Sequence, residues 1–212
     1  MRKGFLEQLD LLNVQIIKMG ALCEKAIEGT TKALFAGDDT YMETSLAIEE
    51  DIDKSERDIE NICMGLFLRQ QPVASDLRNI TSALKMVSDM ERIGDQCADI
   101  SCMIRYIKGY DMSDYSHLST MSRMACTMVS NAVESYVKRD IKLARNVMEM
   151  DDTVDNQFDE AKKHLINLIA KKPDSGEFWI DIIMIAKYYE RIADHAVNIA
   201  EWVEYSILGE HK

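Results

Sequence analysis

The first part of the chain carries apolar residues at alternating intervals of four and three positions. They are Phe5, Leu9, Leu12, Ile16, Met19, Cys23 and Ala26. A stripe of this period is typical of an amphipathic α-helix, and it continues to about Phe35. A second helix is predicted from the apolar residues Ile48, Ile52, Ile59, Ile62 and Leu66. We predict that Pro72 is the first residue of a third helix, where the N–H that proline lacks has no helical partner, and that this helix runs to about Tyr106.

The same pattern starts again after a polar, turn-rich segment, residues 108–116, which we predict to be a linker. Leu118 repeats the place of Ile16, 102 positions on (118 − 16 = 102), and the motif ERIGD at 91–95 returns as ERIAD, 99 positions on (190 − 91 = 99). Slowly drifting offsets along the whole chain indicate an internal duplication. The sequence therefore predicts an all-α fold of two tandem three-helix bundles, residues 1–108 and 116–212.

Charge and composition exclude several classes of function. The net charge of −12 disfavours direct binding of nucleic acid and simple adhesion to anionic lipid. No apolar run reaches the roughly 18 residues of a membrane-spanning helix, and the N-terminal residues turn polar too early for a signal peptide. Five cysteines, without any CxxC, indicate reduced core residues of a cytoplasmic protein. The sequence shows no nucleophile–base set and no glycine-rich phosphate loop, so we expect a protein that is not an enzyme.

Acidic residues form pairs four positions apart on the second and third predicted helices of each repeat. The pairs are Glu49 and Asp53, Glu91 and Asp95, Asp151 and Asp155, and Glu190 and Asp194. On a helix the two acids of a pair stack, and their repulsion costs about 0.2–0.5 kcal/mol even on a solvated surface. Helices joined by a short turn pack antiparallel. If the two pairs of one repeat face each other, four carboxylates converge.

A bound cation would remove the repulsion within such a group of four carboxylates. Ligands that are all oxygen suit Mg²⁺, Mn²⁺ and Ca²⁺, and also iron. We therefore predict that the eight acids are metal ligands. One alternative stays open, in which the acids are solvated helix faces neutralised by Arg92 and Arg191. His195 directly follows Asp194 and so points to a different helix face, which makes it an unsuitable co-ligand.

The chain resembles the PhoU family, the phosphate-uptake regulators of bacteria and archaea. The similar segments occur in the family's order and span nearly the whole chain: RKGFLEQLDLLN, EEDID, QQPVASDLR, ERIGD, MDDTVD and ERIADHAVNIAE. The second ERIxD motif matches closely. The first departs after its aspartate, since Gln96 and Asp99 stand where the family often has His and Asn, which the second copy keeps as His195 and Asn198.

The resemblance implies two three-helix bundles side by side, with (E/D)xxxD motifs that bind multinuclear clusters of divalent or iron-type ions (Mg, Mn, Fe or Zn). It implies a regulator that restrains the phosphate-specific ABC transporter and the sensor histidine kinase of phosphate starvation when phosphate is plentiful. It also implies a homodimer in the cytoplasm, peripheral at the inner face of the membrane. Two other functions stay open: an accessory subunit of a phosphate:cation symporter, and a hydrolase or oxidase that uses the carboxylate-bound metal.

Overall fold

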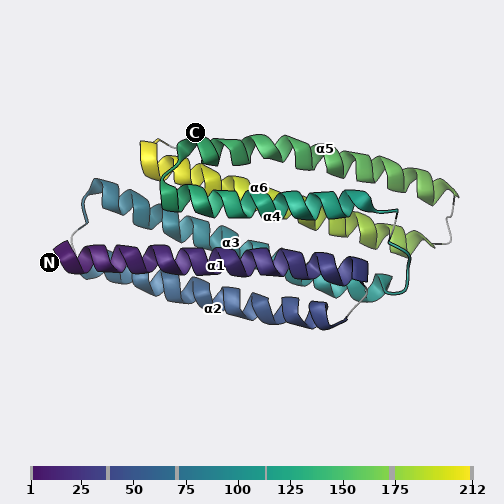
Figure 1. Ribbon diagram of the computed structural model, residues 1–212, viewed down its shortest axis with the longest axis horizontal. Coiled ribbons are helices and arrows are strands. Elements are labelled where there is room, and N and C mark those ends of the chain that lie inside the picture. The colour runs from purple at the N-terminus through teal and green to yellow at the C-terminus, as the bar shows by residue number, and fades with distance from the viewer. Residues whose placement is uncertain (1, 37–38, 70–71, 113, 172–174, 211–212) are drawn as a thin grey trace.

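Six long helices make up the computed structural model of the chain, which describes residues 2–36, 39–69, 72–112, 114–171 and 175–210 (Figure 1). They are α1 (Arg2–Ala36), α2 (Asp39–Arg69), α3 (Ala74–Ile107), α4 (Ser116–Lys138), α5 (Ile141–Lys171) and α6 (Gly176–Leu208). No strand occurs within these described ranges. The prediction of an all-α fold is confirmed, and the polar segment before residue 116 does separate α3 from α4.

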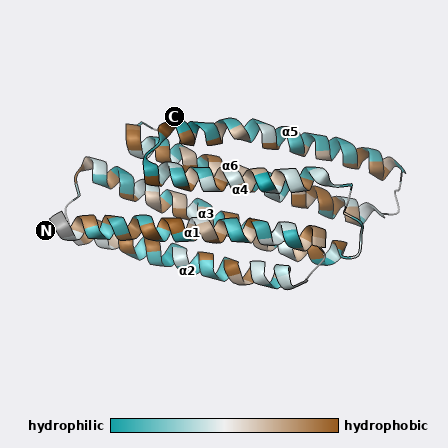
Figure 2. Cartoon of the chain, in the orientation of Figure 1, coloured by the Kyte–Doolittle hydropathy of each residue, from teal (hydrophilic) through white to brown (hydrophobic). Residues whose placement is uncertain are grey.

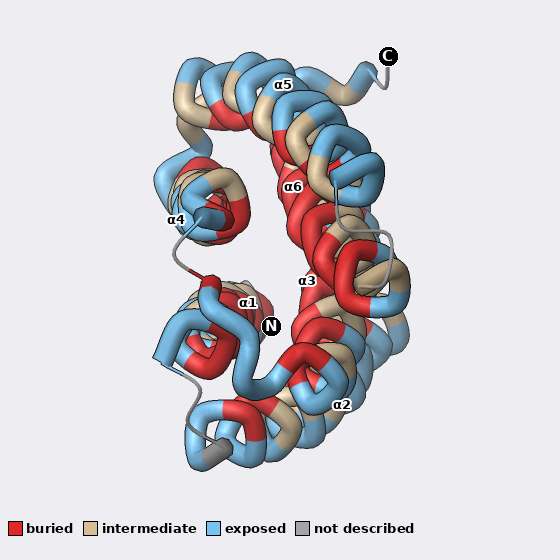
Figure 3. The backbone as a smooth tube through the Cα atoms, turned by 90° about the vertical axis from the view of Figure 1, so that its right-hand side faces the viewer, coloured by how far each residue is buried: buried red, intermediate tan, exposed pale blue. Residues whose placement is uncertain are grey.

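The two repeats pack against each other through their first and third helices. Within each repeat the three helices form a bundle, and between the repeats α3 contacts α6 while α1 contacts α4. Figure 3 shows α1 and α4 side by side, α3 and α6 lying opposite them with much of their length buried, and α2 and α5 at the two outer ends. Buried side chains of both repeats form one continuous hydrophobic core. This core does not separate at residues 108–116. The division into two domains at these residues therefore stays a prediction.

Hydrophobic and hydrophilic residues alternate along every helix, as the periodicity predicts (Figure 2). The start of the third helix is the one boundary that the sequence placed wrongly. Helix α3 begins at Ala74, two residues after Pro72. The reason is local: the Asp76 carboxylate accepts a hydrogen bond from the Val73 N–H at 3.3 Å, which makes Val73 the N-cap residue.

The two ERIxD motifs differ at one packing position, and the neighbouring helix compensates. Gly94 of α3 lies against Ile52 of α2, and a Cβ added at Gly94 would meet two Ile52 carbons at 3.2 Å. The corresponding residues of the second repeat are Ala193 and Val154, both fully buried. One repeat thus pairs a larger side chain with glycine, and the other a smaller side chain with alanine. The duplication has kept the combined volume rather than the residues.

This exchange predicts a rescue between two core positions. We expect Gly94→Ala to lower the free energy of unfolding by about 1–2 kcal/mol, because overpacking outweighs the gain in helix propensity. Adding Ile52→Val should restore the stability to the level of the parent or above it, since the pair then matches the second repeat. Urea unfolding of both single variants and the double variant measures the coupling. Additive effects of the two substitutions would contradict the proposed volume exchange.

Candidate metal centres

The first group of four carboxylates comes together on α2 and α3. Burial raises the pKa of Glu49, and the charges of Asp53, Asp95 and Glu91 raise it further. Burial also raises the pKa of Glu91, with Asp95 as the next cause and Asp53 as a smaller one. The charge contributions to these shifts, which come after burial, require the other carboxylates to lie nearby. The structure therefore places the four acids of the first repeat near enough to interact, without bringing three of them to one point.

The second group of four carboxylates forms in the same way on α5 and α6. Burial raises the pKa of Asp151 to about 6, and the charges of Asp155, Asp194 and Glu190 contribute in that order. The pKa of Asp194 is also raised, chiefly by burial. Glu190 itself is buried in α6, with 9% of its surface exposed. The duplication thus reproduces the crowding of acids in both repeats.

Arginines accompany the first group. The Arg92 guanidinium lies 3.0 Å from an Asp95 oxygen and 3.4 Å from a Glu91 oxygen. Arg57 adds a longer contact of 3.6 Å with Asp53. Arg92 is more than half exposed, so water screens these pairs strongly. The charges of the two cations are therefore too few and too exposed to balance four crowded acids.

A lysine that the sequence analysis did not name pairs directly with the second group. Lys187 forms a salt bridge with Glu190, one turn further along α6. The Arg191 guanidinium instead lies over the ring of Tyr188, 5.8 Å from its centroid, and affects Asp194 only as a minor charge. Lys187 therefore pairs directly with Glu190, while Arg191 acts on Asp194 through a smaller charge effect, and the alternative of neutralisation by arginine stays open.

The donors of both groups suit a hard cation. The buried Asp151 Oδ1 accepts no hydrogen bond from any described residue. A buried carboxylate oxygen without a donor is costly, and a divalent ion is a partner that satisfies it. As the side chains lie, no three histidine, cysteine or acidic residues of the described part converge on one point. The carboxylates therefore suit a hard cation by their chemistry and by their crowding. Their side chains would have to change rotamer to bind one ion together.

A polar contact between the repeats lies next to both groups. The His195 Nδ1 lies 2.9 Å from an Asp89 oxygen, and the Asn198 amide donates to the same oxygen at 3.1 Å. His195 is a lesser cause in the pKa of both Glu91 and Asp194, so this histidine lies near both groups. The Nδ1 of this ring is thus engaged with α3, and the expectation that His195 is not a co-ligand stays a prediction.

The same contact explains the departure of the first motif from the family pattern. The counterpart of Asp89 in the second repeat, 99 positions on, is Tyr188 (89 + 99 = 188). Tyr188 forms a hydrogen bond with Asp99, which is itself the counterpart of Asn198. On one side of the interface Asp89 contacts His195 and Asn198. On the other side Tyr188 contacts Asp99. The residues differ because their partners across the interface differ.

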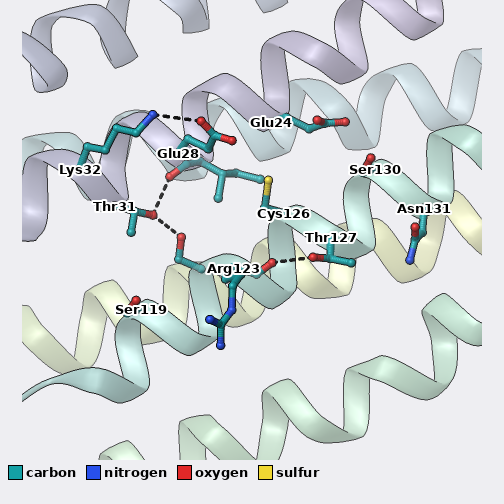
Figure 4. Close-up of a pocket in the computed structure, with 12 residues that line it drawn as sticks. Glu24, Glu28, Thr31, Lys32, Ser119, Arg123, Cys126, Thr127, Ser130 and Asn131 are labelled. Atoms are coloured by element: carbon teal, nitrogen blue, oxygen red, sulfur yellow. Dashed lines mark hydrogen bonds and ion pairs between the residues drawn. The ribbon is translucent and has the colours of Figure 1, made fainter.

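A polar groove between α1 and α4 is a feature that the sequence did not reveal (Figure 4). It has a volume of about 530 Å³ and is lined by hydroxyl, amide and charged side chains of both helices. Within it Thr31 and Ser122 are hydrogen bonded to each other, and beneath it Thr30 lies 3.0 Å from the Tyr189 hydroxyl. Tyr189 directly precedes Glu190, so α6 connects the groove floor to the second group of acids.

On the other side of the repeat axis, the described residues at the corresponding positions pack closely together. There Gly20 and Val133 are the residues that correspond to Ser122 and Thr31, and a Cβ at Gly20 would lie 3.0 Å from Val133. Close apolar packing therefore closes the space that is open and polar in the other half. The sequence does carry a signal of the groove, because Thr30, Thr31, Ser122 and Tyr189 have hydroxyl groups whereas their counterparts in the other repeat are apolar. This signal can be recognised only once the contact between α1 and α4 is known.

The PhoU domain model matches residues 16–104 and 118–203 of the chain. The chain belongs to the PhoU family. The phosphate-specific transport system accessory protein PhoU homolog of Clostridium acetobutylicum is 31% identical to it over 211 residues, which are 99% of this chain and 96% of that protein. The protein of the same name from Aquifex aeolicus is 34% identical over 186 residues, 87% of this chain and 84% of that protein. The resemblance stated from the sequence is confirmed.

Solved structures of the family have the same fold. The crystal structure of PhoU from Pseudomonas aeruginosa superposes with a TM-score of 0.92 at 31% identity, over 97% of this chain and 100% of that chain. The structure of the phosphate transport system regulatory protein PhoU from Streptococcus pneumoniae gives a TM-score of 0.90 at 24% identity, over 98% and 99% of the two chains. Within the described residues, no helix has the length and apolar character needed to cross a bilayer.

Proposed function

We propose that this chain is an accessory protein of a phosphate-specific transport system, which restrains the ABC transporter and the phosphate-starvation kinase when phosphate is plentiful. The observation that carries the proposal is the similarity over nearly the full length to relatives named as accessory proteins of that system. That name speaks of an accessory protein and not of an enzyme. It also favours the ABC-type system over a phosphate:cation symporter. The chain acts as a homodimer at the cytoplasmic face of the membrane.

Metal binding is the second part of the proposal. The two groups of carboxylates would hold divalent or iron-type ions, with Glu49, Asp53, Glu91 and Asp95 at one site and Asp151, Asp155, Glu190 and Asp194 at the other. The support is the crowding of acids in both groups and the unpartnered oxygen of Asp151. A bound ion would supply positive charge that offsets the repulsion among the carboxylates of α2 and α3, and likewise of α5 and α6. The carboxylates fix the relative positions of neighbouring helices by sharing an ion.

The sites and the regulation are tested together with one double variant. We expect Glu91→Gln/Glu190→Gln to bind metal roughly 10–100-fold more weakly or worse, since even loss of an outer-shell partner has an effect of that size. Elemental analysis of protein purified without an affinity metal measures the content. The same variant, returned to a host that lacks the chain, should leave phosphate uptake unrestrained in phosphate-rich medium, whereas the parent restores restraint.

A matched control separates these effects from the loss of a charge. Glu134→Gln removes an exposed acid of α4 that pairs only with Lys138, so metal content and restraint should both stay as in the parent. Equal metal content in the parent and the double variant would show that these carboxylates are not metal ligands. If phosphate uptake stays unrestrained in a host that does produce the parent chain, the regulatory function is removed from the proposal.

A further inference from the structure

The polar groove between α1 and α4 has the size of a site for a small molecule. Its volume of about 530 Å³ lies within the range of roughly 300–1,000 Å³ that is usual for ligand sites. The two helices run antiparallel, with Thr31 against Ser122 and Gly20 against Val133. Close apolar packing fills the space at Gly20 and Val133. The groove is therefore not a general consequence of packing α1 against α4.

The floor of the groove offers hydrogen-bond acceptors, because its hydroxyl protons are already in use. The Thr30 and Thr31 hydroxyls donate to the Ile27 carbonyl oxygen, at 2.7 and 2.9 Å. A hydroxyl group has a single proton. Ser122 is therefore the donor in its bond with Thr31, and Tyr189 is the donor in its bond with Thr30. A ligand that lies on this floor must bring its own protons, as hydroxyl groups do.

The two ends of the groove differ in charge (Figure 4). Lys32 and Arg123 lie towards one end, together with the hydroxyl group of Ser119. Glu24 is about two turns away on α1, on the side of Ser130. Cationic side chains and free hydroxyl groups bind phosphate oxygens, whereas a carboxylate only accepts hydrogen bonds. One end therefore suits a phosphate group and the other suits hydroxyl groups of a ligand.

Both cations of the groove are available to an anion. The Arg123 side chain is exposed, points away from α1, and forms no ion pair with any described residue. Lys32 pairs with Glu28 at 3.1 Å, but both side chains are more than half exposed, so breaking this pair costs little. Exposed side chains change rotamer readily. Both cations can thus turn towards the end of the groove at Ser119.

We propose that the groove binds a sugar phosphate, a phosphate monoester whose organic part carries several hydroxyl groups. The phosphate group lies between Lys32 and Arg123 and accepts a hydrogen bond from the Ser119 hydroxyl. The hydroxyl groups of the sugar donate to the oxygens of the floor and to the Glu24 carboxylate. Free phosphate would use only the basic end, and a sugar without phosphate would use only the rest. The ester alone uses both.

This site is separate from the two groups of carboxylates. The carboxylates lie on α2 and α3 and on α5 and α6, whereas the groove is lined by α1 and α4. The sugar phosphate goes beyond the proposed function, since neither the regulation of transport nor the metal requires it. Binding to the purified chain without metal can fail while the uptake test of the regulatory function still succeeds, so the two failures are distinguishable.

The first test is calorimetry on the chain freed of metal by a chelator, so that a phosphate group cannot bind an ion held by the carboxylates. We expect glucose 6-phosphate or adenosine monophosphate to bind once per chain, and the tighter of the two shows whether a hexose or a ribose fills the groove. Glucose and inorganic phosphate should each bind about tenfold more weakly or worse, because each lacks part of the contacts. Esters that bind no more tightly than inorganic phosphate would overturn the proposal.

A pair of variants with the same change of charge locates the phosphate group. Lys32→Gln/Arg123→Gln should weaken binding of the ester about tenfold or more, because both charged donors are lost. Lys18→Gln/Lys25→Gln removes two exposed lysines of α1 that do not line the groove, so the affinity should stay close to that of the parent. An equal loss of affinity in both variants would mean that the ester is attracted by overall charge and that the groove is not its site.

Glu24→Ala tests the other end of the groove through the sign of its effect. Removing an acid makes the surface less negative, which by charge alone would strengthen the binding of an anion. We expect the ester to bind about fivefold more weakly instead, because its hydroxyl groups lose an acceptor. Stronger binding of the ester in Glu24→Ala would contradict the proposed placement. Thermal unfolding followed by circular dichroism verifies that each variant folds, since every substituted side chain is at least partly exposed.

Discussion

Replacing Arg145 by methionine should lower the free energy of unfolding by about 3 kcal/mol, because it leaves a buried carboxylate without its partner. Glu204 of α6 is only 7% exposed. The Arg145 Nε donates to its Oε1 at 2.9 Å, and a second guanidinium N–H contacts the same oxygen. Arg145 is itself half exposed, so we expect the lower end of the range for broken buried pairs. Urea unfolding at neutral pH measures the change.

The control variants show whether the loss of stability in Arg145→Met comes from the buried charge of Glu204. Adding Glu204→Gln to Arg145→Met should recover most of the loss, since the buried charge is then gone. Lys32→Met removes one partner of an ion pair with Glu28 whose side chains are both more than half exposed, and it should change the stability by less than about 0.5 kcal/mol. A loss from Arg145→Met that persists in the double variant would mean that the arginine stem, and not its charge, stabilises the helix pair.

The helices and their duplication could be predicted because both depend on spacing within the chain. The four-three period of Leu12, Ile16 and Met19 identifies the buried face of α1, and all three side chains are fully buried. The offset between repeats, which drifts only from 102 to 99 positions, then transfers the assignment to the second half. The start of α3 was misplaced because capping by Asp76 is a matter of local hydrogen bonds, which a proline preference does not capture.

The crowding of acids could also be predicted, because each pair lies on one helix and each repeat has a second pair on the adjacent helix. The side-chain contacts between helices could not. Periodicity gives the face of a helix but not its register against another helix, so nothing in the sequence paired Asp89 with His195 across the repeats, or Arg145 with Glu204 within the second repeat. The choice of Lys187 over Arg191 likewise depends on rotamers, since both lie within one turn of Glu190.

The carboxylate groups predict an unusual dependence of stability on pH in protein freed of metal by a chelator. The pKa values of Glu49, Glu91 and Asp194 are raised by burial, and that of Asp151 is raised from 3.8 to about 6. The folded state then binds more protons than the unfolded state between about pH 4 and pH 6, so stability increases as the pH falls through this window. Because Asp151 is partly exposed, we expect about 1 kcal/mol from it after allowance for screening. Urea unfolding at pH 7 and pH 5 measures the change.

Saturating metal should reverse that dependence. An ion that binds only the folded state adds about 4 kcal/mol to the free energy of unfolding at 1,000 times its dissociation constant. Protons compete with the ion for the carboxylates, so this stabilisation declines as the pH falls. Asp151→Asn should reduce both effects, because the amide neither titrates nor replaces an anionic ligand. If chelated protein instead loses stability from pH 7 to pH 5, the acids are solvated faces rather than a crowded site. If Mn²⁺ adds no stability at either pH, the acids do not bind this metal, and Arg57, Arg92 and Lys187 are the cations that pair with them.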